Sequence, residues 1–176
     1  WKEVSHFGYP GFFSAQHYFP DRGQPVFRRS MYTFWKRTSP PPVMTAFDAP
    51  NRETCAVRRS LTNTPLQALV LMNAPQFVQA ARGLAKRMRQ SGPSVTGQIE
   101  FGFRLATGRK PTATETKILH DALERQDAYF AANPERAGAY LNADGTGIGP
   151  ADRAAASAIT SVASLILNLD ETITRE

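Results

Sequence analysis

Helix start and stop signals follow one another at short intervals from Thr62 to the end of the chain. Proline stands one or two residues after a polar capping residue at Pro65, Pro75 and Pro134, early helical positions where its missing N–H costs little. Between these signals, apolar residues recur at spacings of three and four, and no stretch shows the clean alternation of a strand. The chain is therefore predicted to be all-α, an irregular bundle of five to seven helices with short connections.

The expected helices can be placed from their apolar stripes and end signals. Thr112 and Glu115 are predicted to form a capping box, and Gly108 is expected to end the helix before it. Asp48 is expected to cap a short turn that continues through residues 50–59. The predicted helices cover residues 25–37, 65–73, 75–90, 94–108, 112–130, 134–141 and 151–170. Helix 65–73 is apolar nearly all round, which predicts burial, and prolines 40–42 are expected to stop the first helix.

Residues 1–25 are predicted to form an irregular arm rich in aromatic residues, glycine and proline. Residues 26–176 are predicted to form a single all-α domain, because 176 residues suit one core better than two. The chain opens on Trp1 without a leader, so we expect a fragment or a processed product. No run of about 18 apolar residues occurs, which excludes a membrane-spanning helix.

Positive charge is concentrated in the first third of the chain. Residues 22–59 hold eight basic and two acidic residues, so this stretch carries the whole formal excess of +6. A local excess of this kind predicts an anionic partner, because guanidinium groups bind carboxylates and sulfates bidentately. We call residues 26–73 the central segment. Its candidate binding residues are Arg28, Arg29, Trp35, Arg37, Arg52, Arg58, Arg59, Asn63 and Gln67.

The candidate residues admit more than one interpretation. The arginines could pair with Asp48, Glu53 and carboxylates of an upstream domain, could bind an acidic polysaccharide, or could be solvated surface. Asn63 and Gln67 belong to a polar group around Pro65, for which helix capping is favoured. Trp35 lies on the apolar stripe of the first predicted helix, which favours a place in the core over a stacking platform.

Catalysis is not favoured by the sequence. Asp48 and Glu53 could be an acid–base pair for glycoside hydrolysis, but their spacing permits the required separation without demanding it. Cys55 could be a nucleophile beside arginines, yet no Cys-His-Asn pattern accompanies it. No metal site is expected, because the single cysteine excludes a CxxC pair and the three histidines would have to converge from remote segments.

Residues 27–73 of the central segment, FRRSMYTFWKRTSPPPVMTAFDAPNRETCAVRRSLTNTPLQALVLMN, resemble a planctomycete-type domain of unknown function. The resemblance continues through NAPQFVQAARGLAKRM and FRLATGRKPTATE to ASLILNLDETITRE, and is looser over residues 1–25. It implies that this chain is the C-terminal part of a larger domain. It also implies an exported or cell-surface protein that often carries a cytochrome c domain. Haem would then lie elsewhere in the parent protein, with no cofactor in this chain.

Together these observations predict a non-catalytic structural or interaction module. Its expected partners are upstream domains of the same exported protein, contacted through the arginine-rich central segment and the aromatic arm. Binding or processing of an acidic, sulfated or uronic polysaccharide is the alternative. Nucleic-acid binding is a third interpretation, based on the basic and aromatic sequence YTFWKR, although no groove-binding motif accompanies it.

Overall fold

The structure, a computed structural model, describes residues 29–33, 35, 40–50, 54–58, 62–141 and 152–173. Among these residues all regular structure is helical, which confirms the predicted fold class, and six helices have at least seven residues. The chain divides into two compact units, Trp1–Gln67 and Ala68–Glu176. The predicted arm and the boundary at residue 26 lie outside the described residues. None of the described helices is long and apolar enough to cross a bilayer.

The first unit contains only short helices in its described part. A 3-10 turn, η2, covers Ser30–Tyr32, and α1 covers Pro42–Ala46. The predicted continuous helix over residues 25–37 is therefore wrong, because Arg29 and Thr33 have extended ψ angles of 144° and 130° on either side of η2. Aromatic and β-branched residues have low helix propensity, and exposed Met31 and Tyr32 show no burial that could offset it. Pro42 begins α1 as its first residue, so the proline run does more than stop a helix.

Helices α2 to α7 begin and end close to their predicted positions. They are α2 (Pro65–Asn73), α3 (Pro75–Gln90), α4 (Val95–Thr107), α5 (Ala113–Ala132), α6 (Pro134–Leu141) and α7 (Arg153–Leu167). The short helix α8 (Asp170–Ile173) was not predicted, since the last predicted helix, 151–170, ends at Leu167. Ser94 caps α4, and Gly108 ends it in the left-handed conformation with φ 82°. Thr112 and Glu115 form the predicted capping box of α5. Local end signals thus locate the helices of the second unit well.

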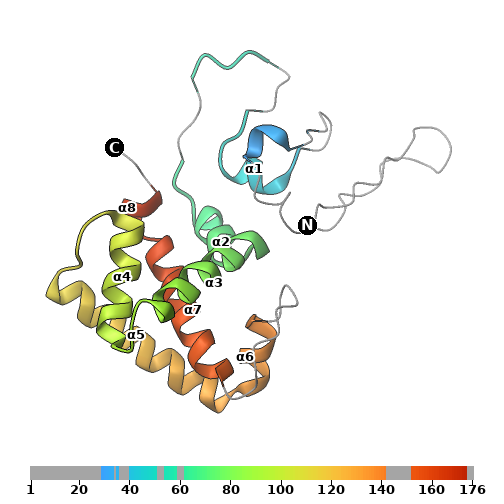
Figure 1. Ribbon diagram of the computed structural model, residues 1–176. Coiled ribbons are helices and arrows are strands. Elements are labelled where there is room, and N and C mark those ends of the chain that lie inside the picture. Colours follow the sequence, from blue (N-terminus) through green and yellow to red (C-terminus); the bar gives the residue numbers. More distant parts are fainter. Residues whose placement is uncertain are drawn as a thin grey trace. The chain divides into compact units, whose positions relative to one another are not determined.

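Helix α7 lies at the centre of the second unit. It contacts α3, α4, α5, α6 and α8, and Figure 1 shows it surrounded by them. Small side chains let these helices approach closely, since Ala156, Ala158 and Ala163 are nearly inaccessible. The hydroxyl of Thr160 is equally buried and donates to the carbonyl of Ala156 at 2.6 Å. The main buried cluster comprises Ala81, Leu84, Ala85, Met88, Ile99, Phe103, Leu119, Ile159, Val162, Ala163 and Ile166.

Arg109 joins the beginning of α5 to α8. Its guanidinium lies 2.7 Å from Glu115 and 2.8 Å from Glu171, and it also covers the ring of Phe103 at 4.8 Å. These bonds raise the pKa of Arg109 further above its ordinary value, with the bond to Glu115 contributing most. The Arg109 hydrogen bond and then the backbone N–H of Thr112 lower the pKa of Glu115 to about 2.

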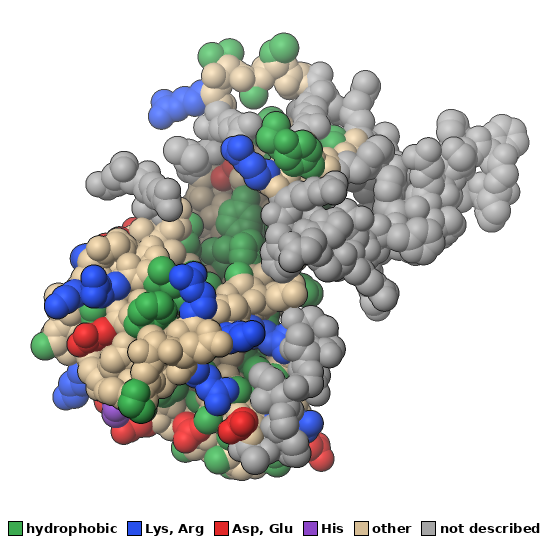
Figure 2. All heavy atoms as spheres, in the orientation of Figure 1, with side chains coloured by type: hydrophobic (Ala, Val, Ile, Leu, Met, Phe, Trp, Pro, Cys, Tyr) green, Lys and Arg blue, Asp and Glu red, His purple; other side chains and the backbone are tan. Residues whose placement is uncertain are grey.

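The apolar helix α2 is not buried, contrary to its predicted burial. Leu66 and Leu69 are 58% and 56% exposed, and Met72 is also open to solvent. Figure 2 shows apolar side chains open on the surface at the position of α2, whereas charges of both signs are mixed over the helices of the second unit. Gln67 is instead the only side chain of α2 that is buried. A helix that is apolar all round becomes buried only where neighbours cover it, and composition alone does not supply those neighbours.

Candidate functional site

Asp48 occupies the left-handed position that ends α1. The N–H of Ala49 donates to the carbonyl of Met44 at 2.9 Å, and the N–H of Asp48 donates to the carbonyl of Thr45 at 3.1 Å. This is the pattern of a Schellman motif, with Asp48 at the position where φ is positive, here 56°. Asp48 therefore ends α1. Residues 51–53 of the turn that it was predicted to cap lie outside the described residues, and residues 54–58 of that turn are not helical. Aspartate tolerates this conformation better than most residues that carry a side chain.

The left-handed turn brings the Asp48 carboxylate to the start of α2. Its Oδ2 accepts the backbone N–H of Thr62 at 2.8 Å and the Thr62 hydroxyl at 2.7 Å. Gln67, only 8% exposed, donates through Nε2 to the Ala46 carbonyl at 2.9 Å and to Thr62 Oγ1 at 3.1 Å. Its Oε1 accepts the N–H of Thr64 at 3.1 Å, which confirms the predicted capping role. We call Asp48, Thr62, Thr64 and Gln67 the polar clamp.

The polar clamp closes the chain between residues 48 and 62, because two side chains join the end of α1 to the start of α2. Within that interval the structure describes residues 49–50, which are half-buried, and residues 54–58, which are all exposed. Val57 is fully exposed, and the thiol-bearing Cys55 and the cation Arg58 are exposed beside it in the sequence. Loops closed at their base and open at their tip are frequent binding elements. The clamp thus presents an apolar residue and a cation together.

The described arginines of the central segment have no anionic partner. Arg29 and Arg58 are exposed, and neither forms an ion pair with a residue that the structure describes. Trp35 is half-buried and Asn63 is exposed. The other candidate residues, Arg28, Arg37, Arg52, Arg59 and Glu53, lie outside the described residues. The structure therefore brings Asp48 and Gln67 together through Thr62, and leaves Arg29 and Arg58 free of carboxylates in the described part of the chain.

The catalytic candidates remain predictions. The Asp48 carboxylate holds Thr62 through two hydrogen bonds, which gives it a structural role at the clamp. Every described residue around Cys55, from 54 to 58, is exposed, so none of these five residues lines an enclosed substrate cleft. The arrangement around the clamp is suited to presenting a surface, because its buried polar groups are used in tying chain segments together.

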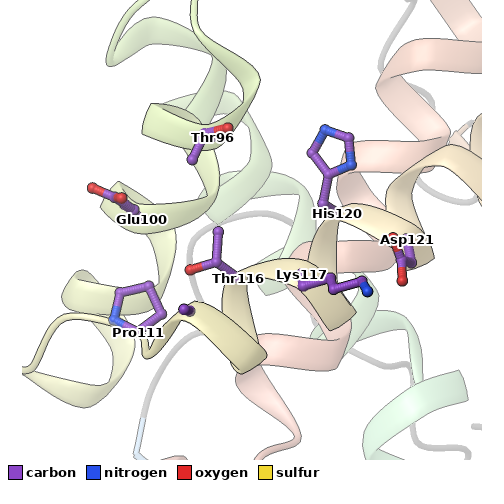
Figure 3. A pocket seen from close by; sticks show the side chains of 8 residues that line it. Thr96, Glu100, Pro111, Thr116, Lys117, His120 and Asp121 are labelled. Atoms are coloured by element: carbon purple, nitrogen blue, oxygen red, sulfur yellow. The ribbon is translucent and has the colours of Figure 1, made fainter.

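A second group of polar side chains lies on α5 and could hold a metal. The ligand atoms of His120, Asp121 and Glu124 all lie within 4.8 Å of one another, with His120 Nδ1 3.5 Å from Glu124 Oε1. His120 and Asp121 also line an open depression of about 590 Å³, whose other wall includes Thr96 and Glu100 of α4. Figure 3 shows the two helices supplying its lining from opposite sides.

Sequence reasoning missed two of these features. The bond between Asp48 and Thr62 spans fourteen residues, a separation at which no local pattern indicates contact. The histidines were considered only in combination with one another, whereas His120 lies beside two carboxylates of its own helix. In the sequence HDALE, His120 and Glu124 are four residues apart and share a helix face, which could have indicated that these two side chains lie together.

A family described as "Protein of unknown function (DUF1553)", PSD1, matches residues 3–123. The chain belongs to the PSD1 family. The match covers every candidate residue of the central segment, together with the helices up to most of α5. No curated protein and no solved structure matches this PSD1 chain. Membership therefore supplies a family whose function is unknown, and the chemistry must be argued from the residues.

Proposed function

We propose that this PSD1 chain is a non-catalytic interaction module whose first unit docks on an acidic protein surface through the central segment. The proposed partner is a neighbouring domain of the same multidomain protein. The planctomycete-type context, the export and the haem-bearing cytochrome c domain elsewhere in the parent belong to this proposal. They rest on the resemblance of the central segment and of the helices that follow it.

One observation carries the proposal. Every buried apolar side chain in the described part of the chain lies between Val78 and Ile166, in the second unit. The described part of the first unit instead exposes Met31, Tyr32, Phe47 and Val57, besides Leu66 at the start of α2. A segment that buries none of its apolar side chains gains little from the hydrophobic effect until a partner covers them.

Charge indicates the nature of that partner. Arg29 and Arg58 are exposed cations beside these apolar side chains, and no described carboxylate neutralises them. An arginine at the edge of an apolar contact forms bidentate bonds with carboxylates, which is the arrangement favoured at protein interfaces. An acidic surface with apolar residues would therefore satisfy both features of the first unit.

Alkylation of Cys55 tests the proposal, because this exposed thiol is the only cysteine of the 176-residue chain. Its labelling rate is measured in the 176-residue chain and in the whole polypeptide that contains it, by mass spectrometry of the Cys55 peptide. We expect labelling about tenfold slower in the whole polypeptide, which corresponds to a docking free energy of about 1.4 kcal/mol. Equal rates in the two forms contradict the proposal.

Charge-reversed variants identify the docking groups. In the whole polypeptide, Arg29→Glu together with Arg58→Glu should restore fast labelling of Cys55. The matched control is Lys86→Glu with Arg125→Glu, which changes the charge equally at exposed positions of α3 and α5. Loss of protection in the control as well would show a nonspecific charge effect and contradict docking through the central segment.

The same labelling assay also tests binding of an acidic polysaccharide or of a nucleic acid. If heparin protects Cys55 in the 176-residue chain, and Arg58→Ala with Arg59→Ala abolishes this, the polysaccharide interpretation replaces docking on a protein. If duplex DNA protects Cys55 at low salt and loses that effect as salt rises, nucleic-acid binding replaces it. Docking on a protein domain predicts no protection by either polymer.

A further inference from the structure

His120, Asp121 and Glu124 are three metal-ligating side chains of α5 whose ligand atoms lie close together. His120 and Glu124, at i and i+4, lie one turn apart on the same helix face, whereas Asp121 starts from an adjacent face and approaches them through its side chain. Their ligand atoms are all within 4.8 Å of one another, and the side chains remain accessible to solvent. Imidazole with carboxylates is a ligand set that first-row divalent cations such as Zn²⁺ bind. The cluster therefore has suitable chemistry as well as proximity.

The distance between two of the ligands matches a zinc site. His120 Nδ1 and Glu124 Oε1 are 3.5 Å apart. Two ligands of one tetrahedral zinc ion, at their usual bond lengths of about 2.0–2.2 Å, are separated by about 3.4 Å. An ion between these two atoms would thus require almost no change in their separation. The Asp121 carboxylate must approach only through rotation of an exposed side chain.

No described cation occupies this position. Asp121 forms no ion pair with a described residue, and among described residues the recorded partner of Glu124 is His120. The neighbouring basic groups, Lys117 and Arg125 on α5, do not neutralise either carboxylate within ion-pair distance. Across the depression, α4 contributes the carboxylate of Glu100. These two carboxylates, which no described lysine or arginine pairs, leave negative charge that a divalent cation would neutralise.

The depression leaves room for further ligands. It has a volume of about 590 Å³ and borders His120 and Asp121, so a bound ion would face an open space (Figure 3). Metal ions with three protein ligands and one open position bind water or a small anionic ligand there. We propose that His120, Asp121 and Glu124 form a binding site for a divalent transition-metal cation, with Zn²⁺ as the best-matched ion and its free position turned toward the depression.

Titration calorimetry with zinc chloride on the 176-residue chain tests this site. We expect saturable binding of one Zn²⁺ per chain, and tetrahedral visible bands when Co²⁺ replaces zinc. His120→Ala and Glu124→Gln should each weaken binding by about tenfold or more. Because these side chains are solvent-accessible, circular dichroism should show both variants folded like the wild type. A folded His120→Ala variant with unchanged affinity overturns the proposal.

Cysteine and histidine residues elsewhere in the chain, which are also able to bind zinc, provide the matched controls. Cys55→Ser and the double variant His6→Ala with His17→Ala should bind zinc as tightly as the wild type. If either control loses binding, zinc is held elsewhere and the proposal is wrong. Absence of saturable binding up to about 1 mM zinc, the weak end of specific affinities, also overturns it. If Mg²⁺ displaces zinc as well as a transition-metal cation does, the site is an acidic surface to which His120 contributes nothing, and the proposal is also wrong.

Discussion

A single residue, Asp48, performs two local tasks in the first unit. Its backbone adopts the left-handed conformation that ends α1, and its carboxylate then holds the backbone and side chain of Thr62. The left-handed conformation costs about 1–2 kcal/mol for a residue with a side chain. The two hydrogen bonds of the carboxylate lie at exposed positions where solvent competes, and at about 0.5–1.5 kcal/mol each they can offset this cost. The conformation of Asp48 is therefore explained by what its carboxylate binds.

A close contact with Met88 also explains why position 102 in α4 is a glycine. A Cβ added there would lie 2.6 Å from the Met88 sulfur and 2.8 Å from Met88 Cγ. Met88 is completely buried, so its side chain cannot move away into solvent. Overpacking of this kind costs about 1–3 kcal/mol, whereas alanine in place of glycine contributes about 1 kcal/mol to a helix. We expect Gly102→Ala to lower the free energy of unfolding by up to about 2 kcal/mol, the difference between these two effects, measured by urea denaturation.

Gly83 in α3 is the matched control for this prediction. An added Cβ at Gly83 would meet no atom within 4 Å, and the residue is exposed. Gly83→Ala should therefore raise the free energy of unfolding by about 0.5–1 kcal/mol, through helix propensity alone. If Gly102→Ala is as stabilising as Gly83→Ala, the close approach of α4 to Met88 does not determine the residue at position 102.

Among the helices, α5 begins with two connected interactions, a capping box and a pair of salt bridges. The capping box fixes its first turn, and Arg109 connects that turn to α8 through Glu115 and Glu171. Because the folded state lowers the pKa of Glu115 from 4.5 to about 2, the ionised carboxylate stabilises the fold above pH 4.5. This stabilisation is lost as the pH falls from 4.5 toward 2, where the folded chain also becomes protonated.

The substitution Glu115→Gln removes the charge of this side chain but keeps an oxygen that can cap the helix. The amide oxygen can still accept the Thr112 N–H, but it carries no charge for Arg109. We expect the variant to be less stable than the wild type at pH 7 and to lose less stability between pH 5 and pH 2. Urea denaturation across this range measures both effects. Glu135→Gln in α6, at an exposed carboxylate with no recorded partner in the described chain, is the control. Parallel pH profiles for wild type and Glu115→Gln contradict the assignment.

Helix α2 shows how an element can be predicted correctly and placed wrongly. Its start follows from the Thr64–Gln67 capping box and Pro65, which are signals within one turn. Its predicted burial rested on composition, and exposed Leu66 and Leu69 contradict it. The buried side chain is the polar Gln67, because each end of its amide has a hydrogen-bond partner in the clamp. Burial there depends on partners that sequence patterns do not reveal.

At the scale of the whole molecule, the two units differ in where apolar side chains are buried. The second unit holds all the buried apolar residues of the described chain, arranged around α7. A chain of residues 62–176 retains this core and the capping residues of α2. We therefore expect it to unfold cooperatively, with a helical circular dichroism spectrum and a melting temperature close to that of the whole chain.

Residues 1–61 provide the complementary test. Among their described members no apolar side chain is buried, so as a separate peptide they should show no cooperative thermal transition. Calorimetry of the two pieces measures both expectations. A cooperative transition in residues 1–61, or its absence in residues 62–176, would show that the hydrophobic core is distributed differently from the burial observed here.

The sequence by itself determined the helical class and the limits of α3 to α6. Proline, caps and apolar periods act within one or two turns, so each helix carries the information for its own ends. The same apolar periods account for the buried faces of α3 and α7, where Ala81, Leu84 and Met88, and likewise Ile159 and Ile166, are buried. Where signals were weak, as over residues 29–33, an apolar stripe was mistaken for a helix.

Three features follow from long-range packing instead: the central place of α7 in its unit, the exposure of α2 and the bonds between Asp48 and Thr62. The physical reason is the range of the interactions. Helix ends depend on neighbours within about four residues, whereas burial and long-range hydrogen bonds depend on groups that folding brings together from distant positions. Residues that act through such long-range contacts can be identified only from the folded structure, which shows both contacting groups.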